Sequence, residues 1–354
     1  MSTPDESAHV RTSARAPTLW CLVAAMLFGA STPAAKAMLG PMGPLLLSGV
    51  LYAGAAIAVL PWALRHASVL RRIDRRNLLR LLGAIFFGGM LGPVLLLWGL
   101  SRAPAASVAL WLNLETVATA ILARAFFREH LHAYAWLAIA LIIAGSAIMA
   151  PWSLEGGSAA LLVALACIAW GLDNNLTAVI DGVTPAQTTF LKGLAAGSLN
   201  VTLGVLLGSS TATGTDVLGA LGIGAMGYGL SLILYISGAQ QLGATRSQLI
   251  FSTAPVWGVA LSWLWLGESI QPSQCIAAGL MAMALWLLHR ERHVHGHAHA
   301  ATAHTHWHRH DDSHHDHAHG AGTRPTGWHT HEHTHEPVVH THAHRPDMHH
   351  RHDH

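Results

Sequence analysis

Long apolar runs alternate with short polar connections along most of the chain. A helix needs about 20 apolar residues to cross the hydrocarbon of a bilayer. Runs of this length predict ten membrane-spanning helices, at residues 18–38, 44–64, 79–101, 104–126, 132–151, 158–180, 185–207, 216–238, 243–266 and 271–289. A polar segment, 1–17, precedes them and a tail, 290–354, follows. The predicted fold class is therefore all-α and integral to the membrane.

One stretch of this pattern occurs twice. Residues 242–270 align without a gap on residues 103–131, 139 positions upstream, and Glu268 falls on Glu129. Such self-similarity indicates two copies of one structural unit. Each copy holds five predicted spans, an odd number, so the second copy enters the membrane from the opposite side. The pattern predicts two inverted five-helix repeats, an architecture common in secondary transporters. The repeats are residues 18–151 and 158–289.

Arginine positions predict how the chain is oriented. The connections after the second and fourth spans hold most of the arginines near the membrane, whereas the opposite side shows chiefly Arg102. Basic residues favour the cytoplasmic side. Both termini are therefore expected in the cytoplasm, in the inner (plasma) membrane of a bacterium. The arginines counted are Arg65, Arg71, Arg72, Arg75, Arg76, Arg80, Arg124 and Arg128.

Composition agrees with a membrane protein. The chain of 354 residues is 52% hydrophobic and only 11% charged, with a mean hydropathy of +0.38, which lies outside the usual balance of soluble proteins. Cys21, Cys167 and Cys275 lie singly in apolar segments, without the spacing of a disulfide framework or a zinc site. The net charge of +2 gives no reason to expect a nucleic-acid partner.

Glu115 is the first candidate for chemistry inside the membrane. It lies eleven residues into its span, which at 1.5 Å per residue is about 16 Å, near the bilayer centre. The other copy of the repeat has Ala254 at this position. Ionisable groups at such depth are costly and are functional candidates by default. Burial favours the neutral carboxyl, which suits a group that takes and releases a proton; the alternative is a carboxyl that only joins helices.

A second polar step lies in the sixth predicted span. Asp173, Asn174 and Asn175 are consecutive, and side chains about 100° apart on a helix cannot all face one cavity. We expect one or two of them to line the cavity and another to bond a neighbouring helix. Lys192, in the seventh span, could pair with Glu115 or Asp173, bind an anionic substrate, or extend to the interface.

Several further residues have two interpretations. Trp111 and Tyr228 could contact a substrate, but Trp and Tyr also pack in cores and at membrane surfaces. Lys36, near the outer end of the first span, is expected to extend to the interface. Glu129 and Glu268 stand at span ends, where a carboxylate favours the start of the following helix.

The tail is dominated by histidine in His-x-His order. With few large aliphatic residues it has no core to bury, so a disordered segment is predicted. Alternate residues of an extended chain share a side, and imidazole binds Zn, Ni, Co or Cu ions. A divalent transition metal is therefore expected on the tail, although a solubilising or pH-sensitive segment is an alternative. The candidate ligands are His293, His295, His297, His299, His304, His306, His308, His310, His314, His315, His317, His319, His329, His331, His333 and His335.

Residues 18–289 resemble the EamA branch of the drug/metabolite transporter superfamily. The resemblance is carried by two five-span halves, by an aromatic-Gly pair early in each half, and by a Glu-ending pair after each fourth span. It implies a ten-helix bundle whose central cavity opens alternately to either side. Two positions depart from the family pattern: Thr116 stands where Pro is usual, and Val50 where a basic residue is usual. The matching pairs are Phe28-Gly29, Trp170-Gly171, Arg128-Glu129 and Gly267-Glu268.

These observations predict a secondary transporter, with export the expected direction, for small metabolites or amino-acid-like solutes, with proton coupling as one mechanism. Two alternatives stay open: a metal- or metal-chelate-linked efflux carrier, and a membrane-anchored metal buffer or sensor that transports nothing. No enzyme is expected, because the spans hold no nucleophile–base set. The expected partners are the lipid bilayer, a small-molecule substrate and divalent metal ions; the sequence leaves a homodimer open.

Overall fold

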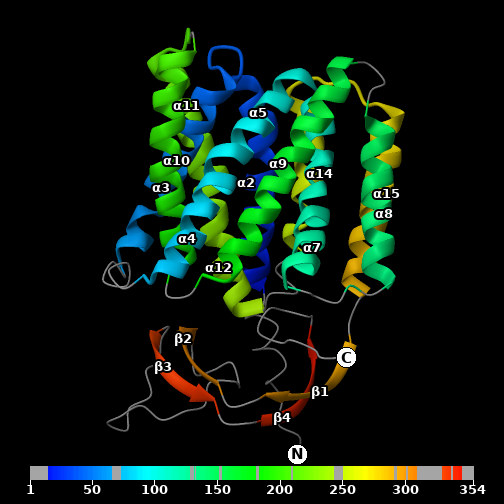
Figure 1. The fold of residues 1–354 in the computed structure, drawn as a ribbon. Coiled ribbons are helices and arrows are strands. Elements are labelled where there is room, and N and C mark those ends of the chain that lie inside the picture. The colour runs from blue at the N-terminus through cyan, green and yellow to red at the C-terminus, as the bar shows by residue number, and fades with distance from the viewer. Residues whose placement is uncertain are drawn as a thin grey trace, which may run out of the picture.

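A computed structural model of the protein contains a helical bundle followed by paired strands (Figure 1). It describes residues 15–65, 73–127, 131, 133–150, 154–180, 183–208, 210–242, 250–290, 293–299, 302–308, 329–335 and 338–344. The helices run side by side between two ends of the bundle (Figure 1). This arrangement is expected of apolar helices that share the thickness of one bilayer.

The helices of the first half coincide closely with the predicted spans. The connections between them are short, and Pro44 opens the second helix at its first position, where the missing N–H of proline costs nothing. The elements are α2 (Arg15–Met38), α3 (Pro44–Leu64), α4 (Arg75–Ala84), η2 (Ile85–Leu91), α5 (Gly92–Arg102), α6 (Ala105–Trp111), α7 (Leu114–Phe127) and α8 (Ala133–Met149).

The second half follows the same order of elements. Thr184 and Thr213 begin two of its helices with reciprocal capping hydrogen bonds, which satisfy backbone N–H groups that a helix start leaves free. The elements are α9 (Leu154–Ala178), α10 (Pro185–Leu207), α11 (Gly214–Gly224), η3 (Ala225–Leu230), α12 (Ser231–Leu242), α14 (Ala254–Trp265) and α15 (Pro272–Arg290).

Membrane insertion follows from the lengths of these helices. Within the described ranges, seven helices are long and apolar enough to cross a bilayer, and the helices Ala133–Met149 and Pro272–Leu287 are apolar but shorter. The predicted span 243–266 is described only from residue 250 onward, where it contains α14. The prediction of an all-helical membrane bundle is thus confirmed.

The third span of each half contains a π-helical segment, η2 or η3. In these segments a backbone N–H donates to the carbonyl five residues earlier, one residue further than in an α-helix. Gly92 N–H donates to Phe87 O, and Ser231 N–H donates to Met226 O. The wider turn of η2 leaves the carbonyl of Gly88 open to side chains. Such π-bulges occur often at functional sites.

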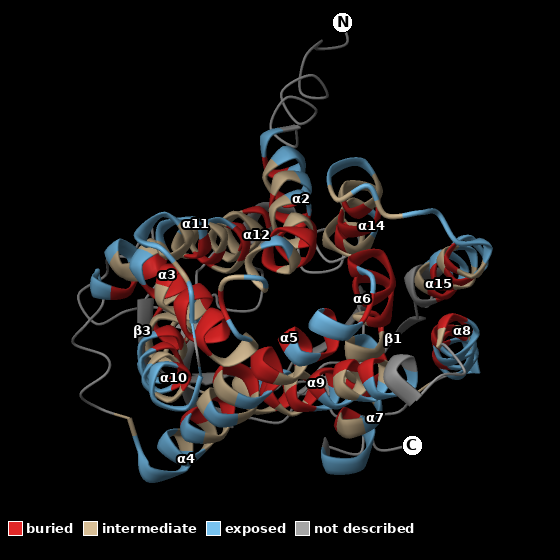
Figure 2. Ribbon diagram, turned by 90° about the horizontal axis from the view of Figure 1, so that it is seen from above, coloured by how far each residue is buried: buried red, intermediate tan, exposed pale blue. Residues whose placement is uncertain are grey.

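The two halves are interlocked through their first helices. α2 lies beside α12 and α14 of the second half, whereas α9 lies beside α5 and α7 of the first (Figure 2). The glycine of each aromatic-Gly pair permits this approach. A Cβ on Gly29 would overlap the carbonyl oxygen of Ala254, and one on Gly171 would lie 3.0 Å from Ala118. Small residues let membrane helices approach closely, so the paired motif holds the halves together.

The main buried cluster lies between α3, α5, α6 and α9 and contains Trp111, which is 1% exposed. The indole Nε1 of Trp111 donates to the carbonyl of Ser146 on α8 at 3.1 Å. The thiol of Cys167 donates to the carbonyl of Trp111 at 3.7 Å. Trp111 therefore joins three helices by packing and hydrogen bonding.

One end of the bundle is held by Glu268. Gly267 has a φ of 65°, the left-handed conformation that commonly ends helices, and it follows Leu266, the C-cap of α14. The Glu268 carboxylate then accepts hydrogen bonds from the backbone N–H groups of Ala105 at 2.6 Å and Ala106 at 2.9 Å. The expectation that Glu268 favours the following helix was wrong, because it caps α6 in the other half.

Lys36 binds the same end of the bundle. Its Nζ donates to the carbonyl oxygens of Leu100 at 2.6 Å and Ala103 at 3.0 Å. These carbonyls end α5, where a positive charge is favourable. Lys36 therefore makes specific contacts with a helix end in place of the predicted extension to the interface. Glu129, the counterpart of Glu268, lies outside the described residues.

The described parts of the tail are four short strands within residues 290–354, the segment that the sequence predicts to be disordered. They are β1 (His293–His299), β2 (Thr302–His308), β3 (His329–His335) and β4 (Val338–His344). β1 pairs with β4 and β2 with β3, both antiparallel. Backbone N–H and C=O groups bond across each pair, so each strand has a partner for its backbone polar groups.

Candidate functional site

The fourth span of each half is broken at an equivalent place. α6 ends at Trp111 and α7 begins at Leu114, while in the second half residues 250–251 are helical and α14 begins at Ala254. Turn residues separate the pieces. At the first break Asn113 N–H donates to Leu110 O at 3.1 Å, and at the second Thr253 N–H donates to Ile250 O at 3.1 Å.

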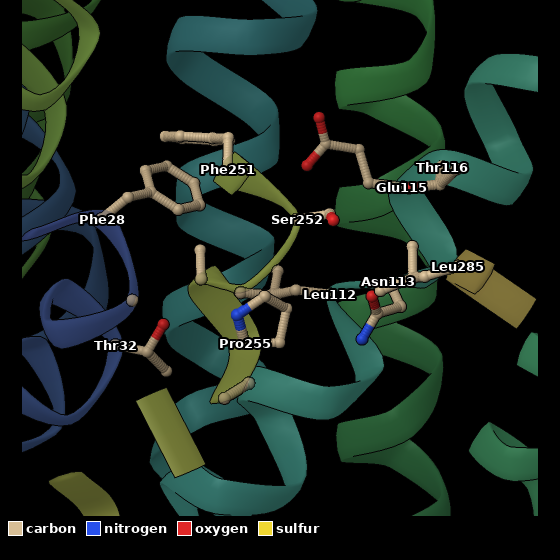
Figure 3. A pocket seen from close by; sticks show the side chains of 13 residues that line it. Phe28, Thr32, Leu112, Asn113, Glu115, Thr116, Phe251, Ser252, Pro255 and Leu285 are labelled. Atoms are coloured by element: carbon tan, nitrogen blue, oxygen red, sulfur yellow. The ribbon is translucent and has the colours of Figure 1, made fainter. Parts of the chain in front are cut away.

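A cavity of about 150 Å³ lies where the two breaks meet α2 and α15 (Figure 3). Broken membrane helices commonly line substrate and ion sites, since backbone groups freed there can contact a ligand. Both breaks therefore contribute to one space between the halves. The lining residues are Phe28, Gly29, Thr32, Ala109, Leu112, Asn113, Glu115, Thr116, Phe251, Ser252, Ala254, Pro255 and Leu285.

Glu115 supplies the charged group of this cavity. It lies in the first turn of α7, where the helix dipole stabilises a negative charge. Its Oε1 accepts a hydrogen bond from Nδ2 of Asn174 on α9 at 2.8 Å, and the same amide donates to Thr119 Oγ1 at 3.2 Å. In Figure 3 the carboxyl group points toward the side of the cavity where Phe28 and Phe251 lie.

Asp173 and Lys192 form an ion pair between α9 and α10. Their side chains are only 10% and 14% exposed, respectively. Thr177 Oγ1 donates to Asp173 Oδ1 at 3.0 Å, and Asp173 packs against Gly88, where any Cβ would overlap the carboxylate. The pair is thus fixed in a tight polar site next to the π-helical segment η2.

The three consecutive polar residues of α9 serve three different contacts. Asn174 bonds Glu115 and Asp173 pairs with Lys192, while Asn175 Nδ2 donates to the carbonyls of Thr119 at 3.1 Å and Gly171 at 2.8 Å. Their divergence is what helix geometry requires. None of the three lines the cavity. α9 therefore connects the cavity carboxyl to the ion pair.

A row of aromatic rings crosses the same region. Ring centroids are 6.0 Å apart for Tyr52 and Tyr228, 5.9 Å for Tyr228 and Phe28, 5.4 Å for Phe28 and Phe251, and 4.7 Å for Phe251 and Tyr235. These separations are those of favourable aromatic pairs. The row runs from α3 through η3 and α2 to the second break.

The Tyr52 end of the aromatic row lies against the π-helical segment η2. Tyr52 donates its hydroxyl hydrogen to the Gly88 carbonyl at 2.6 Å, and Trp170 Nε1 donates to the same oxygen at 3.0 Å. The carbonyl released by the π-bulge is thus satisfied by two side chains. The aromatic row and the Asp173–Lys192 pair therefore adjoin the same turn of η2.

The structure brings together part of the predicted set. Glu115 and Asn174 are hydrogen-bonded, Asp173 and Lys192 are ion-paired, and Tyr228 contacts the cavity residue Phe28 edge to face. Trp111 lies in the core and outside the cavity lining. Phe28 and Phe251 were not predicted as lining residues, and neither helix break was predicted. The signals for the breaks were Asn113 and Pro255, which lie inside apolar runs. 

The predicted tail ligands are described only through their backbone. His293, His295, His297 and His299 lie in β1, His304, His306 and His308 in β2, and His329, His331, His333 and His335 in β3. His310, His314, His315, His317 and His319 lie outside the described residues. Among the described residues, no group of three His, Cys, Asp or Glu residues is placed to hold a metal ion.

The model of the EamA-like transporter family matches the chain twice, over residues 16–150 and 157–290. The chain belongs to the EamA-like transporter family. One crystal structure to which this EamA-like transporter is similar has a TM-score of 0.57 at 19% identity, with 77% of this chain and 96% of that chain covered. That likeness supports the fold alone. A search of the curated proteins gives no match.

Membership in the EamA-like family accords with an integral membrane protein that carries small solutes. The two matched segments meet at the cavity, because α2, α6 and α7 belong to the first, and Pro255 and Leu285 to the second. Thr116, which departs from the usual proline, is a lining residue. The departure therefore falls in the wall of the cavity of this EamA-like transporter.

Proposed function

We propose that the protein is a secondary transporter built from ten spans in two inverted repeats, and that it works by alternating access. The observation that carries this proposal is the cavity of about 150 Å³ between the two broken helices, with Glu115 in its wall. Equivalent π-segments in both third spans support the repeat. An odd number of spans in each repeat would place the second repeat in the opposite orientation, as in inverted-repeat transporters.

Glu115 is the residue we assign to coupling. A carboxylate near the middle of the membrane can exchange a bound proton for a cationic group of a bound solute, because either one neutralises its charge. Asn174 orients the carboxyl, and the nearby Asp173–Lys192 pair is neutral as a unit. We propose export of small metabolites or amino-acid-like solutes from the cytoplasm of a bacterium. The arginine-rich connections, and with them both termini, then face the cytoplasm.

Alternating access predicts that the cavity is reached from both sides of the membrane. After replacement of Cys21, Cys167 and Cys275, a Thr32→Cys variant in proteoliposomes should react with an impermeant thiol reagent added to either side. Thr32 is suited to this test because it lines the cavity and is 4% exposed. Ser210→Cys, in an exposed connection, should react from one side only. One-sided labelling of Thr32→Cys would contradict alternating access.

A metal-linked role is a second candidate, supported by the register of the tail strands. Three rungs of each ladder place His opposite His: His293 and His344, His295 and His342, and His297 and His340 in one, and His304 and His333, His306 and His331, and His308 and His329 in the other. Directly opposed positions lie close enough to interact, and neighbouring imidazoles suit Zn, Ni, Co or Cu ions. The tail would then gather or sense metal for a carrier of metal chelates.

Deleting residues 293–354 tests this second role. The truncated protein should retain its bundle, since α15 ends at Arg290, but should lose stoichiometric binding of Zn and Ni measured by titration calorimetry. Under the metal-linked role, cells producing it should also tolerate less metal. A full-length variant with Gln at the twelve rung histidines serves as the control for length. Unchanged metal tolerance would exclude the metal-linked carrier and the metal buffer, but not solute transport.

A further inference from the structure

The described wall of the cavity contains one carboxyl group and no basic side chain. Among the 13 described residues that line it, Glu115 is the one ionisable side chain. Lys192 is committed to Asp173, and Lys36 donates to the carbonyls of Leu100 and Ala103. Among these described residues a solute carboxylate would therefore find no basic side chain, whereas an ammonium group would find the Glu115 carboxyl group.

The helix starts at the two breaks do not offer an anion site either. Backbone N–H groups at a broken helix can bind an anionic substrate. The start of α7 already carries the Glu115 carboxylate in its first turn. The start of α14 contains Pro255, which has no N–H to donate. The start of α7 thus disfavours a carboxylate on the solute, and the start of α14 has one N–H donor fewer to offer it.

Aromatic rings occupy the side of the cavity toward which Glu115 points (Figure 3). Phe28 and Phe251 have centroids 5.4 Å apart. Aromatic faces attract cations and also pack against apolar groups. A cavity of about 150 Å³ can hold one six-membered ring, and the volume found here is about the same.

We infer that the solute of this cavity is an organic ammonium ion with an apolar body about the size of one ring, which narrows the small metabolites and amino-acid-like solutes proposed above to amines without a carboxylate. Its ammonium group binds Glu115, and its body packs against Phe28 and Phe251. Bound solute and bound proton then each neutralise the same carboxylate, so the two exclude one another. That the bound ammonium ion is transported rests on the proposed function, whereas its chemical class rests on the cavity alone.

The test compares three probes that share one ring and differ in charge: benzylamine, benzyl alcohol and benzoate. Binding is measured by titration calorimetry on the full-length protein in phosphatidylcholine nanodiscs, whose lipid carries no net charge. Benzylamine should bind saturably, benzyl alcohol about 10- to 100-fold more weakly, as expected on loss of a charge-assisted hydrogen bond, and benzoate not at all. Benzoate or benzyl alcohol binding as tightly as benzylamine, or no saturable benzylamine binding, would overturn the inference.

Variants locate the binding. Glu115→Gln should reduce benzylamine affinity to that of benzyl alcohol, whereas Glu115→Asp should keep the preference for the amine. Phe251→Leu keeps apolar volume but removes a ring, so it should weaken benzylamine more than butylamine. Asp74→Asn removes a carboxylate outside the cavity at a helix cap that Asn also satisfies, and should change nothing. A preference that survives in Glu115→Gln contradicts the assignment to Glu115.

Flux measured separately distinguishes the two proposals. Benzylamine binding that depends on Glu115, without counterflow of any probe in proteoliposomes, would contradict the transport function and retain the ammonium site. Counterflow of benzoate and not of benzylamine would retain the transport function and overturn the ammonium site.

Discussion

Replacing Glu115 by Gln should abolish the part of solute flux that depends on a pH gradient. The substitution removes the proton-binding group but preserves its size, and the amide oxygen can still accept the hydrogen bond that Asn174 Nδ2 makes to Oε1 at 2.8 Å. Uptake into proteoliposomes with an imposed pH gradient should fall to the level without a gradient. Because the hydrogen bond is kept, the stability of the bundle should change by no more than about 1 kcal/mol.

Two controls accompany this measurement. Glu115→Asp keeps a titratable group and should retain part of the coupled flux. Asp74→Asn should transport like the parent protein, because Asp74 caps α4 through Asn77 N–H at 3.1 Å and lies outside the cavity lining. Proton-coupled flux that is unchanged in Glu115→Gln would show that another group carries the proton.

Replacing Lys192 by Met should destabilise the bundle more than any other single change proposed for it. The substitution leaves Asp173 as an uncompensated charge with a side chain 10% exposed. Breaking a buried ion pair from one side costs about 3–5 kcal/mol. The melting temperature of the purified protein in detergent should fall accordingly, and the double variant Asp173→Asn, Lys192→Met should recover most of the loss.

The recovery is the decisive part of that experiment. A buried pair replaced as a whole is often neutral in stability, because the desolvation cost of both charges disappears with their attraction. Lys36→Met gives a matched comparison, since Lys36 bonds only the neutral carbonyls of Leu100 and Ala103. It should cost less than Lys192→Met. Equal losses for both lysines would contradict the assignment of an energetically coupled pair.

The positions of the helices were predictable because bilayer thickness fixes the length of an apolar run. The predicted span 185–207 and α10 (Pro185–Leu207) coincide, as do 44–64 and α3. The breaks at residues 112–113 and 252–253 were not predictable in the same way. Hydropathy averages over a window, and a turn of two residues inside an apolar run barely changes that average.

Partners within the site were predictable only as alternatives. Lys192 could have countered Glu115 or Asp173, since the sequence contains no information on which face of α9 meets α10. The π-helical segments were not predictable from local sequence either. The Gly88 carbonyl accepts hydrogen bonds from the side chains of Tyr52 and Trp170, which are distant in the sequence, in place of a backbone N–H of its own helix. Local sequence specifies helices here, whereas tertiary contacts specify where they deviate.

The exchange of first helices between the halves has a consequence for biogenesis. Among the described helices α2 is synthesised before the others, yet its main neighbours, α12 and α14 (Figure 2), belong to the last third of the bundle. Until they are inserted, the face around Gly29 has only lipid to contact. Since chains begin to fold during synthesis, α2 lacks its main protein neighbours while the helices between α2 and α12 are being translated. The packing around α2 is therefore completed only after α12 and α14 have been inserted.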